Sequence, residues 1–433
     1  HSSRSPPWSD LILDHLDMNA PTDAGWTHLY LAAQEGNLSD LGWLLLQGAA
    51  VDAPTIEGAL PLHAACANGR VTVALALLAH GAAPSASVDD FAAPPPLHVL
   101  CGAAEPARGA LAIAAALVQA GADVGVRDAD GATPLLVLSR TAATSSCATP
   151  ASSEPRTRLA ALLLFSGAAA RASDCRGRSA VWYVAHAGEE PMLELLLSGA
   201  GGAAAADIAD SDGATPLWVA TANSYTGCVR RLLAARADGS APAVQGCPPI
   251  CLAAANGDLE TLQALVDGGC RIDGPDATGA TALFHAACQA HLPCVELLLR
   301  HGATVDAEDD ARLTPFMAAF SKGHSAVVEA LRYAGADITR SAPKKPLLPS
   351  TPPLPRVIAD DDAVSRVPQY TLPGFKASQA VTLEMGTDAY VRRRKPRIVP
   401  RAPWVPATEW VPPQSPENGA LGEQRERDEG ASA

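Results

Sequence analysis

Apolar residues recur along most of the chain in a pattern that fits pairs of short helices. The clearest example lies in residues 279–307, where Thr281 is placed to cap a first helix and Gly302 to end a second one. Its apolar positions, at helical spacing, are Leu283, Ala286 and Ala287 in the first helix and Leu292, Val295, Leu298 and Leu299 in the second. Neither predicted helix is long enough to be stable alone, so the unit must pack against copies of itself.

The copies are present, and they recur at a nearly constant interval. Their starts are Thr27, Leu60, Pro95, Thr133, Ser179, Thr215, Pro248, Thr281 and Thr314, at successive spacings of 33, 35, 38, 46, 36, 33, 33 and 33 residues. The strings LPLHAACANG at 60–69, DGATPLLVL at 130–138, SDGATPLWVA at 211–220 and LTPFMAAFSKG at 313–323 agree with one another. A 33-residue period of a turn and two helices, with these motifs, resembles the ankyrin-repeat family over about residues 9–340.

The resemblance implies an all-α fold, an ankyrin-repeat solenoid of helix-turn-helix pairs with projecting hairpin turns. We expect a disordered segment over 1–9, the solenoid over 10–340, and an extended, largely irregular tail over 341–433. Residues 10–21 look like a partial repeat that caps the N-terminal end. Repeat three carries extra residues around 102–109. Repeat four is interrupted by the Ser/Thr/Ala/Pro stretch 139–156, which we expect to loop out.

The tail differs from the repeats in composition and in charge. It holds 15 of the 36 Pro residues, and its net charge is +2, against −16 for residues 1–340. Its basic focus is the segment 391–401, VRRRKPRIVPR. The solenoid therefore carries an acidic field that would steer basic partners toward it.

Composition also bears on the compartment. No apolar run reaches the roughly 18 residues that would suggest a membrane span. The ten Cys lie singly, which favours an intracellular, reducing compartment, with cytoplasm or nucleus first. The chain begins at His1 rather than Met, so we expect a processed or truncated product, and an organelle stays open.

Candidate chemistry is sparse, and we expect no enzyme, no metal and no cofactor. Cys247, Cys251 and the set His285, Cys288 and His291 come nearest to metal-ligand spacing, but they are not paired as zinc ligands are. No nucleophile elbow, phosphate loop or HExxH string is present. The resemblance to ankyrin repeats places His63 and His98 at a position where the family has a His with a structural role. We therefore expect them to be scaffold residues.

Two sets of residues in the solenoid have both a structural and a functional interpretation. The acidic turn residues Asp128, Asp130, Asp210, Asp212, Asp306, Glu308, Asp309 and Asp310 could serve turn chemistry, which is favoured, or form an acidic binding rim. The aromatics near the starts of first helices could fill the gap between repeats, which is favoured, or act as hot spots. As candidate partner contacts in the solenoid we name Trp182, Trp218, Asp212, Asn223, Asn256 and Gln289.

In the tail, the candidate contacts are basic and aromatic residues. They are Arg392, Arg393, Arg394, Trp404 and Trp410. They would clasp a protein surface, with the Trp side chains as apolar anchors, or contact nucleic acid through phosphate contacts and stacking. The second interpretation is the weaker one.

Together these features predict a non-catalytic protein–protein interaction module. We expect a scaffold or accessory subunit of a larger assembly, with the tail as an anchoring arm. Two alternatives remain open: an adaptor that recruits a client to a second machine, and an RNA- or ribonucleoprotein-associated subunit that uses the basic and aromatic tail. The partner itself is not encoded in any motif that we find.

Overall fold

A computed structural model describes residues 18–22, 25–85, 94–103, 109–144, 150–199, 201–241 and 246–338. Within these ranges the chain is helical, and its one extended pairing is an isolated antiparallel bridge between Ser173 and Ser179. The expected all-α repeat fold is confirmed. Over the same residues, no helix combines the length and the apolar character needed to cross a membrane.

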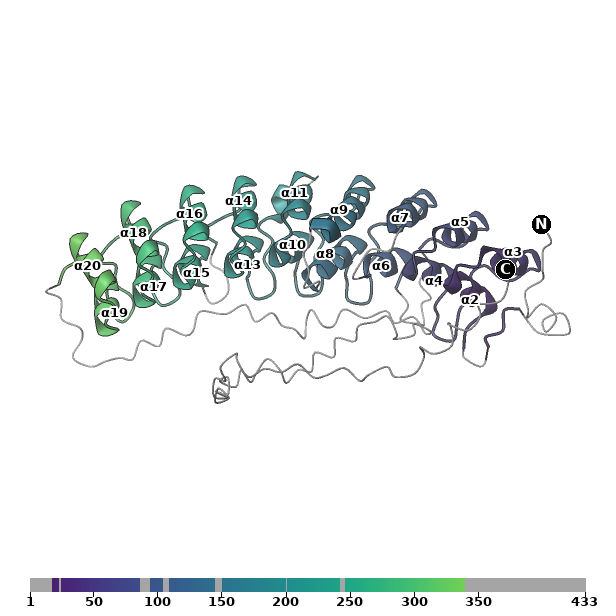
Figure 1. The fold of residues 1–433 in the computed structure, drawn as a ribbon, viewed down its shortest axis with the longest axis horizontal. Coiled ribbons are helices and arrows are strands. Elements are labelled where there is room, and N and C mark those ends of the chain that lie inside the picture. Colours follow the sequence, from purple (N-terminus) through teal and green to yellow (C-terminus); the bar gives the residue numbers. More distant parts are fainter. Residues whose placement is uncertain are drawn as a thin grey trace, which may run out of the picture. The chain divides into compact units, whose positions relative to one another are not determined.

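The first helices of the repeats form one layer. In chain order they are α2 (His28–Glu35), α4 (Pro61–Ala67), α6 (Pro96–Cys101), α8 (Pro134–Thr144), α10 (Ala180–Ala187), α13 (Pro216–Ala222), α15 (Pro249–Asn256), α17 (Ala282–Cys288) and α19 (Pro315–Ser321). Each of these helices contacts the next one in the series (Figure 1).

The second helices form another layer, which packs against the layer of first helices. They are α3 (Leu38–Leu46), α5 (Val71–Ala79), α7 (Ala110–Gln119), α9 (Pro150–Phe165), α11 (Glu190–Ser198), α14 (Thr226–Ala234), α16 (Leu259–Asp267), α18 (Leu292–Arg300) and α20 (Ser325–Tyr333). A short helix, α12 (Gly202–Ala205), lies in the lengthened turn after α11. Each second helix also contacts the first helix of its own repeat, so the two layers form a stack of helix pairs (Figure 1).

Side-chain caps explain where the first helices begin. The hydroxyls of Thr27, Ser179, Thr215, Thr281 and Thr314 each accept the backbone N–H three residues further on, at 3.2–3.4 Å. This bond satisfies a donor that the first helical turn leaves unpaired. At Leu60, which has no such oxygen, Nδ1 of His63 accepts the Leu60 N–H at 3.0 Å instead. All nine repeat starts predicted from the sequence immediately precede a first helix.

The core is built from leucines and small residues. Leu298 on α18 and Leu232 on α14 are fully buried, and so are Ala254 and Ala287 on the first helices. Small residues let successive first helices approach closely, whereas leucines fill the space between the layers. One buried cluster of this kind runs through all nine repeats, from Leu29 on α2 to Leu331 on α20.

The fourth repeat differs from the sequence prediction. Residues 139–144 continue helix α8, and residues 150–156 already belong to α9. The predicted loop over 139–156 is therefore wrong at both ends, and Arg156 is fully buried. The Ser139 hydroxyl donates to the carbonyl of Leu135 at 2.8 Å, which satisfies it inside the helix. Tertiary packing of α8 and α9 thus overrides a loop-like composition.

Several predicted segments lie outside the described residues. These are the segment 1–9, most of the N-terminal partial repeat, residues 104–108 of the extra stretch in repeat three, and the tail 341–433 with its basic focus.

Candidate functional site

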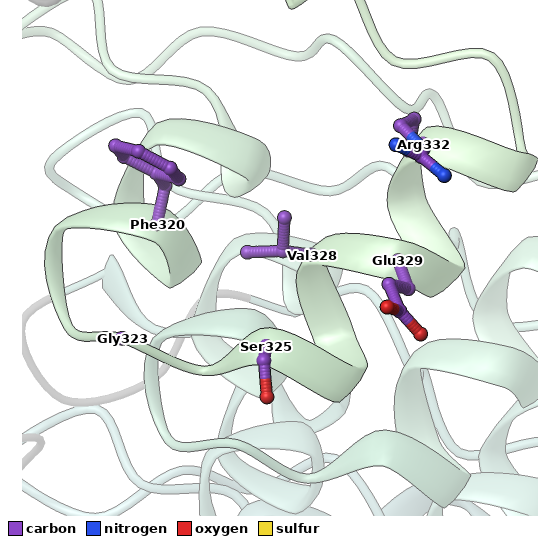
Figure 2. Close-up of a pocket in the computed structure, with 6 residues that line it drawn as sticks. All are labelled: Phe320, Gly323, Ser325, Val328, Glu329 and Arg332. Carbon is purple, nitrogen blue, oxygen red and sulfur yellow. The ribbon is translucent and has the colours of Figure 1, made fainter.

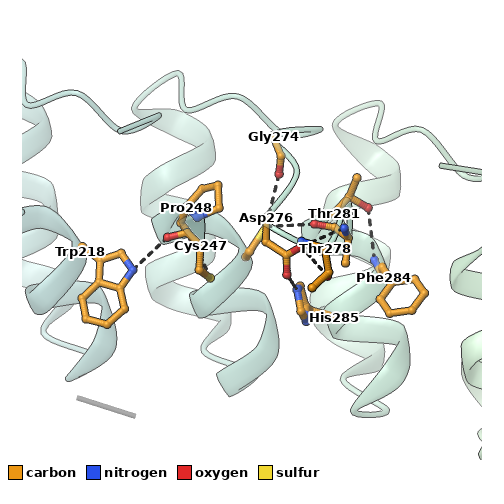
Figure 3. Close-up of polar contacts among 11 residues, drawn as sticks. Trp218, Cys247, Pro248, Gly274, Asp276, Thr278, Thr281, Phe284 and His285 are labelled. Carbon is orange, nitrogen blue, oxygen red and sulfur yellow. Dashed lines mark hydrogen bonds and ion pairs between the residues drawn. The ribbon is translucent and has the colours of Figure 1, made fainter. Parts of the chain in front are cut away.

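Each of several long turns is held by one aspartate that lies five residues before the repeat start. In the turn before α17, Oδ1 of Asp276 accepts the N–H groups of Thr278 at 2.8 Å and Ala280 at 3.0 Å (Figure 3). The equivalent residues Asp128, Asp174, Asp210 and Asp309 accept turn N–H groups in the same way. These carboxylates satisfy buried backbone donors, which makes them part of the turn.

The second oxygen of this aspartate is also used in three of the turns. Oδ2 of Asp276 lies 2.8 Å from Nε2 of His285, and Oδ2 of Asp174 accepts the hydroxyl of Tyr183 at 2.6 Å. Oδ2 of Asp210 lies 3.6 Å from Nε of Arg178. Burial alone would raise the pKa of Asp276, but hydrogen bonds from His285 and Thr278 lower that pKa to about 2. The Asp276 carboxylate is therefore charged at neutral pH, and both of its oxygens accept hydrogen bonds from neighbouring residues.

A second set of turn acids ties each repeat to the next. Asp52, Asp207, Asp273 and Asp306, each eight residues before a repeat start, accept a backbone N–H that lies 31 residues further along the chain, at 2.8–3.2 Å. Asn19 makes the same bond to the N–H of Ala50. These side chains form a ladder along the turns, so the structural interpretation of many acidic turn residues is confirmed.

In three repeats, the residue three positions after the repeat start makes a third connection. In repeat six this residue is Trp218, whose Nε1–H donates to the carbonyl of Cys247 in the next turn at 3.0 Å (Figure 3). Trp182 donates to Ala214 at 3.2 Å, and Nε2 of His98 lies 2.9 Å from the carbonyl of Ala132. In these three cases, the carbonyl just before a repeat start is thus paired by a side chain of the preceding repeat.

The burial of this position shows whether Trp182 and Trp218 can contact a partner. Trp182 and Trp218 are 4% and 2% exposed. Their indoles fill the gap between repeats, so neither side chain offers surface to a partner. The proposal of these two residues as contacts is corrected, because their single polar group is used within the stack.

The other candidate contacts in the solenoid do lie on its surface. Asn223, Asn256 and Gln289 occupy the same place at the ends of α13, α15 and α17, and these helices are neighbours. Asn256 and Gln289 are exposed, whereas Asn223 is half-buried and donates from Nδ2 to the carbonyl of His186 at 3.5 Å. Asp212 is exposed at a turn tip, away from that row. The five tail candidates lie outside the described residues.

The side chains that are left exposed on the turns lie mainly at the turn tips. Exposed tip residues include Ile56, Glu57, Cys175, Ser211, Asp212, Asp310 and Arg312. Neighbouring tips are joined by their backbones, since the N–H of Ser211 donates to the carbonyl of Arg176 and that of Asp310 to the carbonyl of Thr278. Within the described residues, these bonds join the tips of repeats five and six and the tips of repeats eight and nine, and each joined pair holds its exposed side chains in fixed order.

The exposed turn tips carry both acidic and basic side chains, and one of the predicted acids already has an ion-pair partner. Of the predicted acidic rim, Asp130 lies 3.6 Å from the buried guanidinium of Arg140. Asp212 and Asp310 remain exposed, on the tips of the sixth and ninth repeats. The rim that a partner could meet is thus narrower than the sequence predicted.

The residues that suggested metal or catalytic chemistry have structural roles. His63 is fully buried and caps its own helix, and Sγ of Cys251 lies 3.4 Å from the carbonyl of Gly274. Burial raises the pKa of the Cys251 thiol, so this group stays protonated at neutral pH. No group of three or more His, Cys, Asp or Glu side chains within the described ranges is arranged to hold a metal ion.

The family assignment rests on a match of the sequence to a known repeat. Three copies of the ankyrin-repeat model match residues 9–88, 151–242 and 250–342, more than half of the chain. The chain belongs to the ankyrin-repeat family. The third repeat and the first helix of the fourth fall between the matched ranges, and the structure supplies them through helices α6, α7 and α8.

Among solved structures, this ankyrin-repeat chain is similar to the ankyrin repeat domain of Bcl-3, described as a unique member of the IkappaB protein family. The two share 24% sequence identity with a TM-score of 0.46, over 64% of this chain and 99% of that one. No curated protein sequence matches the chain significantly. Ankyrin repeats form protein–protein interaction modules, and members of the family are generally non-catalytic.

Proposed function

We propose that this chain is a non-catalytic scaffold or accessory subunit that binds a partner protein along the edge formed by its turn tips. One observation carries the proposal. The turn aspartates and the inter-repeat tryptophans are occupied inside the stack, whereas Asp212 and Asp310 are exposed on two tips that are each joined to a neighbouring tip through the backbone. A rigid row of exposed side chains is suited to hold a partner surface in one register.

The partner surface that fits this edge is basic. Residues 1–340 carry a net charge of −16, and the exposed tip acids add local attraction to that field. Such a field raises the rate of encounter with a positively charged protein and is screened by salt. Asn256 and Gln289, exposed at the C-terminal ends of α15 and α17 and away from the tips, would add hydrogen bonds where the partner extends beyond the tips.

The tail is proposed to act as an anchoring arm of the same subunit. The segment 391–401 is basic, and Trp404 and Trp410 follow it. Four prolines at 396, 400, 403 and 406 disfavour a helix there, so the segment would bind as an extended strap. Trp side chains would hold the strap in place, and the arginines would set orientation and on-rate.

The tip proposal is tested by affinity purification of the full chain. The variant Asp212→Lys with Asp310→Lys reverses two exposed tip charges without removing a turn bond. The matched control is Glu260→Lys with Glu296→Lys, which makes the same charge change on second helices α16 and α18. We expect the tip variant to lose most of the proteins that the wild type retains, and the control to retain them. Equal retention by both variants would move the binding surface away from the tips.

The arm is tested separately, by sedimentation of tail variants with the native assembly. We expect Trp404→Ala with Trp410→Ala to weaken retention more than neutralising Arg392, Arg393 and Arg394. Unchanged sedimentation of both variants would make the tail a linker. Salt-dependent retention of nucleic acid that is lost on removal of 389–413 would instead favour the RNA-associated alternative.

A further inference from the structure

The last repeat exposes a position that every earlier repeat buries. Six residues after the repeat start, the first eight repeats carry a small side chain that is at most 1% exposed, namely Ala33, Cys66, Cys101, Ser139, Ala185, Thr221, Ala254 and Ala287. The ninth repeat carries Phe320 there, and its side chain is 69% exposed. Each of the first eight positions is followed by a further repeat, whereas the ninth lies in the last repeat of the described residues. The solenoid thus presents a large aromatic at its open C-terminal end.

Phe320 lines a shallow groove on this end face. The groove has a volume of about 340 Å³ and is lined by Phe320, Gly323, Ser325, Val328, Glu329 and Arg332 (Figure 2). Phe320 also stacks on Phe316, with 6.1 Å between ring centroids. The groove therefore has an apolar floor from Phe320 and Val328, and a polar rim that includes one carboxylate and one guanidinium.

The shape of this face does not suit another helix pair. A following repeat needs a small residue at the place of Phe320 in order to approach closely. A second residue also departs from the pattern, because Arg332 stands where six earlier repeats carry Leu45, Leu78, Leu197, Leu233, Val266 and Leu299. A second copy of the chain that stacked its own first repeat here would meet both obstacles. A thin, extended segment avoids them.

The chain itself supplies such a segment nearby. The described residues end at Ile338, five residues after α20 ends at Tyr333. The sequence then continues with PKKPLLPSTPPLPRVI over residues 343–358. Helix α20 is roughly 13 Å long at 1.5 Å per residue, whereas the nine residues from Ile338 to Leu347 span up to about 30 Å when extended. Leu347 can therefore reach the groove from Ile338.

The composition of this segment matches the groove. Prolines hold a chain extended, so little conformational freedom is lost on docking. Leu347 and Leu348 are apolar like the floor, and Lys344 and Lys345 are opposite in charge to Glu329. Because the segment is tethered, its effective concentration at the groove is on the order of millimolar, which favours it over a free partner.

We propose that residues 343–358 dock in an extended conformation into the groove on the last repeat and so cap the open end of the solenoid. Leu347 and Leu348 pack against Phe320 and Val328, and the Lys344–Lys345 pair lies beside Glu329. The cap shields the exposed aromatic, as a terminal repeat with a polar outer face would do. This inference concerns the end face and is independent of partner binding at the turn tips.

Photo-crosslinking in the full chain tests the occupant directly. A benzophenone amino acid in place of Phe320 would be irradiated in a mixture of isotopically light and heavy protein. We expect crosslinks to residues 343–358 within the same chain. Crosslinks between light and heavy chains would make a second copy the occupant, and crosslinks to other parts of the tail would move the site. Either result, or no crosslink at all, overturns the proposal.

Hydrogen exchange gives a second test with the native Phe320 in place. The variant Leu347→Ser with Leu348→Ser should raise amide exchange in α19 and α20 by about tenfold, because the cap is weakened. The matched control, Leu372→Ser with Leu383→Ser, removes two leucines elsewhere in the tail and should leave exchange in these helices unchanged. Equal exchange in both variants and the wild type would overturn the cap.

Discussion

Arg156 on α9 and Glu189 at the start of α11 form an ion pair inside the second-helix layer. Nη1 of Arg156 lies 3.0 Å from Oε1 of Glu189, and the two side chains are 0% and 2% exposed. The pair joins the fourth repeat to the fifth, where the spacing between repeat starts is longest. The irregular repeat is thus connected to its neighbour by a buried charge contact.

Removing one partner of this pair should be costly. Arg156→Met leaves the Glu189 carboxylate buried without its counter-charge, so we expect a loss of about 3–5 kcal/mol in the free energy of unfolding. Adding Glu189→Leu should recover most of that loss, since the orphaned charge is then gone. Urea unfolding of the full chain measures both.

A control for this experiment lies on the same helix. Arg158 pairs with Glu154 at an exposed site, and Arg158→Met should change stability by less than about 0.5 kcal/mol. If Arg156→Met lowered the free energy of unfolding as little as Arg158→Met does, Glu189 would be solvated in solution and the buried contact would be absent.

Truncation of a core leucine should act locally before it acts on the whole stack. Leu298 on α18 is fully buried, and Leu298→Ala should destabilise the protein by about 2–5 kcal/mol. In a linear array the damage should reach α16 and α20 first. Peptide-resolved hydrogen exchange checks this, with Leu46→Ala, at an exposed position on α3, as control. Uniform loosening of all nine repeats would contradict the model of nearest-neighbour coupling.

Stability should fall in mild acid because of His63. Burial lowers the pKa of this imidazole to about 4 from its ordinary value of 6.5. Between these two values the unfolded chain binds a proton that the folded chain does not, so stability is lost as the pH falls through this window. The contribution of this group is on the order of 3 kcal/mol.

The measurement compares wild type with His63→Gln, which has no titrating group at this position. Unfolding free energies at pH 7, 6, 5 and 4 should show a shallower decline for the variant. Parallel declines for the two proteins would mean that His63 is accessible to protons in the folded state.

The repeat starts could be predicted because their signals are local. Thr215 and Thr281 bond to the N–H three residues further on, and this contact depends on short-range sequence alone. The turn aspartates carried a comparable signal, since an acid recurs five residues before several starts, but their pairing with residues such as Tyr183 depends on the helix that follows.

The errors arose where distant contacts decide the structure. Residues 139–156 have the composition of a loop, and only the packing of α8 and α9 and the Arg156–Glu189 pair show that most of them are helical. Tryptophan is common at binding hot spots. The indoles of Trp182 and Trp218 are nevertheless buried, and they donate hydrogen bonds to carbonyls of the following repeats. Such acceptors cannot be inferred from the residues next to each tryptophan.

Partner binding at the turn tips should be visible by hydrogen exchange. The experiment measures exchange in the full chain, free and in complex with the protein that the chain retains most strongly. We predict slower exchange in the tip segments 211–213, 277–279 and 310–312, with unchanged exchange in the second helices α14, α16 and α18. Protection confined to those second helices, with none at the tips, would contradict the account.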